Sequence, residues 1–197
     1  MVHQKSFFLS LVCIVLTVLT PRVHGQDTTT VQAFNLKDGQ GKTFDLQAHK
    51  DKAAIVVFFT SSNCAFATRY LDRINQLHLD FKEKNISFVA INSNDASLSQ
   101  RDEESLMRQY VPFAFPYLKD ESQAVAKGFG AVRNPEAFVL QPINGTFKKV
   151  YQGAIDDNPF EKSVNVSYVR EVLTSILKKE TPKHSKVAGK GCDIRWK

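Results

Sequence analysis

Cysteine and tryptophan are scarce in this sequence, with three cysteines and one tryptophan among 197 residues. The chain has no glycine-rich phosphate loop and no dinucleotide-binding fingerprint, and its histidines lack the spacing of metal ligands. It also has no internal repeat and no arginine-rich stripe interleaved with aromatic residues. These absences argue against nucleotide-dependent, metal-dependent and nucleic-acid-binding proteins, and they imply no metal or organic cofactor.

Long apolar runs are scarce too, with one exception near the N-terminus. The run Phe7–Leu19 is almost entirely apolar, follows a short segment containing Lys5, and is succeeded by permissive residues up to Gly25. This pattern predicts a signal peptide over residues 1–25, cleaved near Gly25, with Cys13 as part of it. An uncleaved membrane anchor is the alternative, but it needs roughly 20 apolar residues. We therefore expect a secreted or periplasmic protein with no stable membrane insertion after cleavage.

The net charge of +6 is unevenly distributed. Residues 178–197 carry seven Lys or Arg against two acidic residues, so the rest of the chain is close to neutral. Such a basic end is usually a solvated and partly mobile segment. We expect residues 181–197 to form a tail of this kind, and we expect no nucleic-acid partner.

Strand and helix patterns alternate from residue 31 onward, which predicts one α/β domain over residues 26–180 with helices on both faces of a sheet. Short extended segments around Asp38–Gly41 predict a β-hairpin, and the apolar run Ala53–Thr60 predicts a strand buried on both faces. A helix is expected over residues 64–84, because its apolar residues are spaced three or four apart. The other expected elements are strands at 86–91, 115–118, 136–140 and 147–152, helices at 102–110, 122–129 and 167–179, and a hairpin turn at Asn144–Gly145.

The junction between the buried strand and the first helix carries the most chemical information. Ser61, Ser62 and Asn63 have helix-capping side chains, and Cys64 follows in the first helical turn. Unpaired backbone N–H groups and the helix dipole favour a thiolate at such a position. The alternative is that Cys64 fills space, since free cysteine is among the most buried residue types.

The order and spacing of several segments resemble the redoxin branch of the thioredoxin superfamily, which includes the alkyl hydroperoxide reductase/thiol-specific antioxidant proteins. The resemblance covers roughly residues 31–178 and depends on the Asp38–Lys42 turn, Ala53–Cys64, Phe88–Asn92, Phe115–Asp120, Phe129-Gly130, Asn134-Pro135 and Asn144-Gly145. The ending Gly191–Lys197 also resembles that of a peroxiredoxin-like subgroup. The resemblance implies a thioredoxin-like three-layer sandwich, with a mixed central sheet, helices on both faces and an N-terminal β-hairpin.

The resemblance also implies roles for individual residues. Cys64 corresponds to the reactive cysteine, and Ser61 to the Thr or Ser whose hydroxyl polarises the peroxide and the thiolate. Pro135 corresponds to a cis-proline that faces the cysteine. Arg133 corresponds to an arginine that stabilises the thiolate, although an ordinary loop charge is an equal alternative. Cys192 is a candidate to resolve oxidised Cys64; the alternatives are a structural bridge or pairing with another chain.

Several positions depart from the family pattern. Ser61 replaces the first cysteine of a Cys-x-x-Cys motif, so no disulfide can form within such a motif. Val57 stands where the peroxidases have proline, Ile55 where thioredoxin keeps a buried acid, and Thr60 where tryptophan is usual. These departures argue against efficient thioredoxin-style reduction.

The leading hypothesis is an extracytoplasmic thiol-dependent oxidoreductase that reduces peroxides or disulfides through Cys64. Its partners would be a peroxide or protein disulfide and an external thiol reductant, such as a thioredoxin-like donor. A second hypothesis is a single-cysteine thiol-disulfide oxidoreductase that acts on protein partners through mixed disulfides. A third is a catalytically silent thioredoxin-like binding module, in which both cysteines are structural or idle.

Overall fold

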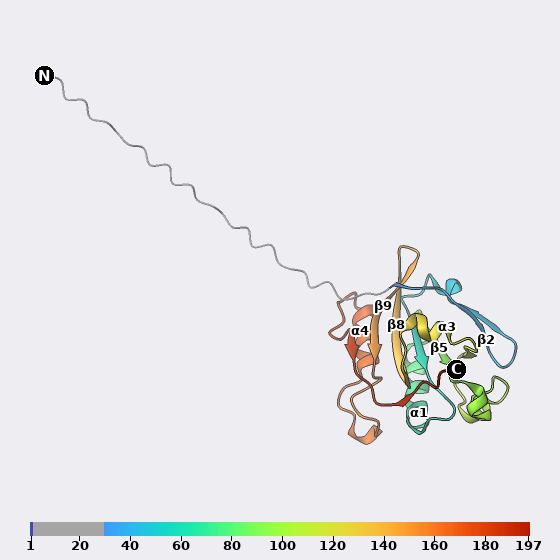
Figure 1. Ribbon diagram of the computed structural model, residues 1–197. Coiled ribbons are helices and arrows are strands. Elements are labelled where there is room, and N and C mark those ends of the chain that lie inside the picture. Colours follow the sequence, from blue (N-terminus) through green and yellow to red (C-terminus); the bar gives the residue numbers. More distant parts are fainter. Residues whose placement is uncertain (2–29) are drawn as a thin grey trace.

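The computed structural model describes Met1 and residues 30–197 (Figure 1). The predicted signal peptide therefore lies outside the described residues, apart from Met1. In the described part of the chain, no helix is long and apolar enough to cross a membrane.

The middle layer is a mixed seven-stranded sheet. Its strands are β1 (Thr30–Val31), β4 (Ala54–Phe59), β5 (Ile86–Asn92), β6 (Tyr117–Lys119), β8 (Glu136–Ile143), β9 (Thr146–Gly153) and β10 (Lys186–Val187). The order is β1-β9-β8-β4-β5-β6, with β10 paired to β9. Strands β4, β5 and β6 run parallel, whereas β8 is antiparallel to both β4 and β9. The carboxyl ends of β4 and β5 therefore meet at one edge, where the polar segments that follow them come together.

Both faces of the sheet are covered, because every residue of β4 is buried and successive side chains point to opposite sides. On one face, Val56 and Phe58 pack with α1 (Ala65–Phe81) and α4 (Tyr168–Leu177). On the other face, Val57 and Phe59 pack with α3 (Ala124–Phe129) and with residues of the β2–β3 hairpin. The expected three-layer sandwich is thus confirmed, with the hairpin formed by β2 (Asn35–Lys37) and β3 (Thr43–Asp45).

The segment around residues 102–110 differs from the predicted helix. A 3-10 turn covers Gln100–Asp102, and α2 is confined to Met107–Tyr110. Between them Glu103 is extended, with φ −68° and ψ 141°. The reason lies at Asp102, whose fully buried carboxylate accepts hydrogen bonds from other segments and so turns this stretch of chain inward.

The C-terminal tail also differs from the expectation of a solvated, partly mobile end. Strand β10 joins the sheet, and β11 (Cys192–Asp193) pairs antiparallel with β7 (Arg133–Asn134). Ile194 is 3% exposed and belongs to the hydrophobic core. In Figure 1 the red C-terminal segment runs from the α4 side across the domain and ends near β5. Many of the tail's basic side chains remain exposed, but its backbone is docked through strand pairing that charge composition does not reveal.

Candidate active site

Cys64 lies between β4 and α1, at the N-cap position of the helix. Its backbone is extended, with φ −127° and ψ 119°, and its side chain is only 2% exposed. The first backbone N–H groups of a helix have no partner within the helix and favour negative charge nearby. The position therefore suits a thiolate once the cysteine is reduced.

A disulfide joins Cys64 to Cys192 across 128 residues of sequence, with the two Cα atoms 6.0 Å apart. Cys192 lies in β11 and is partly exposed, whereas Cys64 is buried. The sequence left the pairing of these cysteines open, and the structure places them in one intramolecular bond. The described protein is thus the oxidised form.

Pro135 lies where the resemblance implied, directly beside the cysteine. The Asn134–Pro135 peptide bond is cis, and the carbonyl oxygen of Asn134 lies 3.0 Å from the sulfur of Cys64. Asn134 belongs to β7, which pairs with the strand that contains Cys192. The cis-proline segment therefore contacts both sulfur-bearing segments.

The Ser61 hydroxyl lies in a buried polar network behind the cysteine. It donates to Oδ1 of Asp102 at 2.9 Å, and it accepts from the Asn63 backbone N–H at 3.0 Å and from Nδ2 of Asn94 at 2.9 Å. A serine hydroxyl has one proton and two lone pairs, so these bonds use its full capacity. In the oxidised form the Ser61 hydroxyl is held by this network.

Asp102 is the centre of this network and was not singled out from the sequence. Its carboxylate is fully buried and accepts from the Ser61 hydroxyl, the Ser62 backbone N–H and the side-chain amides of Asn92 and Asn94. Four donors compensate the cost of burying this charge. One sequence signal does point here. Asn92 ends the buried parallel strand β5 and Asn94 follows it, at the carboxyl end where parallel strands commonly carry sites.

Two further polar groups shape the electrostatics around the network. Burial lowers the pKa of Lys119, whose Nζ donates to the carbonyl oxygen of Asn94 at 2.6 Å. Burial also raises the pKa of Tyr117, whose hydroxyl lies 3.2 Å from the hydroxyl of Ser62. The Lys119 amine and the Tyr117 phenol of β6 thus belong to the same buried polar cluster as the Asp102 carboxylate.

Arg133 is directed toward the tail. Its Nη1 donates to Oδ1 of Asp193 at 2.8 Å and to the carbonyl oxygen of Gly191 at 3.5 Å. The side chain is 44% exposed. In the oxidised form this arginine therefore contacts the segment that carries Cys192.

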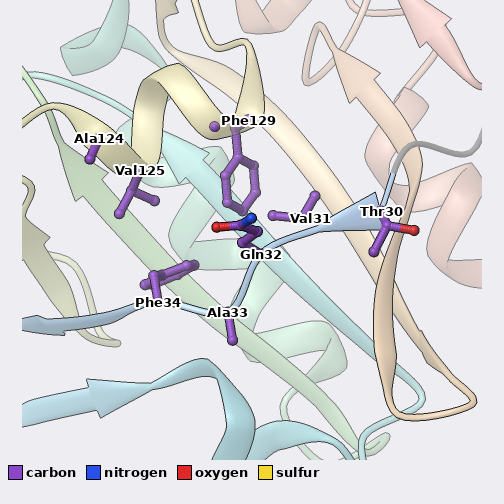
Figure 2. A pocket seen from close by; sticks show the side chains of 9 residues that line it. Thr30, Val31, Gln32, Ala33, Phe34, Ala124, Val125 and Phe129 are labelled. Atoms are coloured by element: carbon purple, nitrogen blue, oxygen red, sulfur yellow. The ribbon is translucent and has the colours of Figure 1, made fainter.

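A groove lies elsewhere on the described part of the chain. It has a volume of about 480 Å³ and runs between residues 30–34 and α3. Figure 2 shows the apolar side chains of Val31, Phe34 and Phe129 around it, and no ionisable side chain lines it. A smaller pocket of about 270 Å³ lies beside Pro135 and is closed by tail residues 186–189. Among the described residues, no group of three or more His, Cys, Asp or Glu side chains could hold a metal ion.

Comparison with known proteins identifies the family of the chain. The model of the AhpC/TSA family matches residues 28–150. The chain belongs to the AhpC/TSA family. Relatives of this redoxin include the chloroplastic peroxiredoxin Q of Suaeda salsa, which is 24% identical over 151 residues covering 73% of this chain and 65% of that protein. Glutathione peroxidase 1 of Helianthus annuus is 28% identical over 96 residues covering 49% of this chain and 55% of that protein. The redoxin thus spans between half and two thirds of the length of these two curated relatives.

Solved structures confirm the thioredoxin-like fold of this AhpC/TSA member. A hypothetical protein, SMc02350 from Sinorhizobium meliloti 1021, superposes with a TM-score of 0.78 and 30% identity over 86% of this chain and 94% of that one. A putative thiol:disulfide interchange protein DsbE from Chlorobium tepidum superposes with a TM-score of 0.60 and 21% identity over 76% of this chain and 96% of that one. The likeness to the DsbE structure concerns the fold alone.

Proposed function

We propose that this redoxin is a thiol-dependent oxidoreductase of peroxiredoxin-like type, secreted or periplasmic, in which Cys64 is the reacting thiol and Cys192 resolves its oxidised form. One observation carries the proposal: the cysteine at the start of α1 is bonded to a cysteine of the C-terminal tail, beside a cis-proline. That bond is the product expected when a resolving thiol has reacted with an oxidised one.

The proposed reaction has three steps: oxidation of Cys64, resolution by Cys192 and reduction by an external thiol. The Cys64 thiolate attacks one oxygen of the peroxide and the O–O bond breaks. The departing oxygen takes up a proton and leaves as water or an alcohol. Cys64 is then a sulfenic acid, oxidised by two electrons. The Cys192 thiol attacks that sulfur, the disulfide forms and water leaves. An external thiol donor returns both cysteines to the reduced form by two exchange reactions, and is itself oxidised to a disulfide.

In the reduced form, Ser61 and Arg133 are proposed to assist Cys64. The Ser61 hydroxyl is held by Asp102 and Asn94 in the loop that leads into Cys64, which limits its rotation. Arg133 immediately precedes Asn134, whose carbonyl oxygen contacts the sulfur. In the reduced form its guanidinium would approach the Cys64 thiolate from this neighbouring position.

Val57 and Ile55 bear on the type of chemistry. Both are fully buried in the hydrophobic core, at the positions where peroxidases keep a proline and thioredoxin keeps a buried acid. The protein therefore has no acid on β4 to assist proton transfer. In the proposed reaction, protons are therefore transferred by solvent and by the polar network around Ser61 and Asp102.

The decisive experiment is intact mass spectrometry of the reduced protein after a brief, near-stoichiometric peroxide pulse. Loss of two hydrogens in the wild type, and a gain of oxygen on Cys64 in a Cys192→Ser variant, are expected. Cys64→Ser is the matched control and should remain unmodified. An unchanged wild-type mass would refute the peroxidase proposal.

Disulfide exchange with a protein partner is a second candidate, because β7 already pairs with an extended segment whose cysteine is bonded to Cys64. Incubating the reduced Cys192→Ser variant with disulfide-bonded candidate proteins and trapping mixed disulfides at Cys64 tests it. If neither peroxide nor disulfides modify Cys64, the protein is a binding module of the same fold.

The location is tested separately. N-terminal sequencing of the protein recovered from the medium or periplasm of an expressing host should begin near Gln26. Recovery of the intact N-terminus in the membrane fraction would contradict the proposed signal peptide.

A further inference from the structure

The tail residues after Cys192 are held by contacts that do not involve sulfur. The backbone N–H of Ile194 donates to the carbonyl oxygen of Val132 at 3.0 Å, and the Ile194 side chain is packed in the core. Asp193 forms the ion pair with Arg133 described above. The segment is thus docked immediately beyond the disulfide, beginning at the residue after Cys192.

Two amide side chains bind the main chain of the tail from different segments. Oδ1 of Asn94 accepts from the backbone N–H of Arg195 at 3.0 Å. Nε2 of Gln123 donates to the carbonyl oxygen of Arg195 at 2.8 Å, and its Oε1 accepts from the backbone N–H of Lys197 at 2.9 Å. The Asp95 N–H also donates to the Arg195 carbonyl oxygen at 2.9 Å. Asn94 and Gln123 therefore bind backbone groups of the tail.

The buried Gln123 side chain is held in position for this contact. It is 1% exposed and has a φ of 60°, in the left-handed region that few non-glycine residues adopt. Its amide also donates to the carbonyl oxygen of Ser93 at 2.8 Å, which fixes the side chain from behind. A strained, buried residue of this kind persists only where its surroundings stabilise it.

Asn94 connects the tail to the candidate catalytic residues. Its Oδ1 receives the Arg195 N–H, while its Nδ2 donates to the Ser61 hydroxyl and to Asp102. The same side chain therefore contacts both the docked tail and the network behind Cys64.

We propose that residues 193–197 form an anchor that remains docked when the disulfide is reduced, and that Gln123 and Asn94 are positioning residues that hold Cys192 beside Cys64. Because the anchor begins at the residue after Cys192, and Cys192 itself pairs with Asn134, reduction frees only the cysteine side chain. The two thiols then keep a high effective concentration, because the docked anchor already restricts the distance between them. The consequence for peroxide turnover depends on the proposed function: Cys64 sulfenic acid is resolved before further oxidation. The docking of the anchor does not depend on the proposed function.

Amide hydrogen exchange on the reduced full-length protein tests the anchor directly. The Ile194 and Arg195 amides should stay protected after reduction, because their hydrogen bonds to Val132 and Asn94 do not involve the disulfide. Exchange at the rate of a free peptide on reduction would overturn the proposal.

Equilibration with glutathione measures the positioning effect without peroxide. Gln123→Asn keeps a residue type that tolerates a positive φ but shortens the side chain, so it should lose the contacts to Arg195 and Lys197. The effective concentration of the two thiols should fall by about tenfold or more. Arg195→Ala is the matched control, because it keeps the backbone groups that are bound, and it should match the wild type.

Ile194→Ala provides a second variant should Gln123→Asn fold poorly, and it should also lower the effective concentration. Wild-type values in both Gln123→Asn and Ile194→Ala would refute the positioning role. Failure of the peroxide experiment alone would refute the proposed function and leave the anchor standing.

Discussion

The hydroxyl of Ser61 donates a hydrogen bond of 2.9 Å to the carboxylate of Asp102, 41 residues further along the chain and fully buried. The bond joins the loop before the reacting cysteine to a segment that would otherwise continue as helix. The site is therefore held from behind by a buried carboxylate that accepts hydrogen bonds from four donors.

Asp102→Asn should destabilise the protein. The substitution replaces one acceptor oxygen by an NH2 group that faces donors, so at least one buried donor loses its partner. We expect the free energy of unfolding, measured with denaturant, to fall by about 2 kcal/mol or more. Glu83→Gln, at a side chain that is 87% exposed, is the control and should change it by less than about 0.5 kcal/mol. Equal effects would contradict the assigned role of Asp102.

Gly191→Ala should weaken the Cys64–Cys192 bond. A Cβ at this position would lie 2.5 Å from the carbonyl oxygen of Asn134, which must shift or push the tail away. We expect the disulfide to be reduced at a lower glutathione concentration than in the wild type. Gly128→Ala is the matched glycine control, because nothing lies within 4 Å of its Cβ. It should leave the disulfide unchanged and stabilise α3 by about 0.5–1 kcal/mol.

Stability should decline in mild acid, in part through His78. Burial, and secondarily Lys82, lower the pKa of His78 below 6.5; the ring packs against Phe88 and Phe115. The unfolded chain then binds a proton more readily than the folded protein, so the contribution is complete above 6.5 and is lost as pH falls through the lowered pKa. His78→Leu should show a smaller loss of unfolding free energy between about pH 7 and pH 5. The same decline in both proteins would contradict the prediction.

The ion pair between Arg133 and Asp193 should contribute little to stability. Its side chains are 44% and 82% exposed, so water screens the attraction between the two charges. A double-mutant cycle of Arg133→Gln and Asp193→Asn should give a coupling free energy of about 0.2–1 kcal/mol. If Arg133 also assists the Cys64 thiolate, Arg133→Gln should slow thiol alkylation of the reduced protein while Asp193→Asn does not. Identical alkylation rates in both variants would limit Arg133 to its contact with the tail.

Much of the fold follows from local patterns in the sequence. The apolar run that became β4 and the spacing of Tyr70, Ile74 and Leu77 in α1 predict their elements because burial of one face or both dictates the residue type. The Asn144–Gly145 turn was likewise predictable, since both residues adopt positive φ, at 51° and 75°. The order of these elements, with Cys64 at a strand–helix junction and Pro135 further along, also indicated where the site would lie.

Tertiary structure alone decided the rest. Asp102 resembles any surface acid near a helix start until Ser61, Asn92 and Asn94 are brought around it by the parallel pairing of β4 with β5. The tail resembles a solvated basic end because much of its docking uses backbone groups, one isoleucine and one cysteine. Its charged side chains stay largely exposed even where Asp193 and Lys197 form ion pairs. Local sequence determines which residues are buried in a strand or helix; contacts between segments far apart depend on where the chain places them. The pairing of Cys64 with Cys192 is a contact of that second kind.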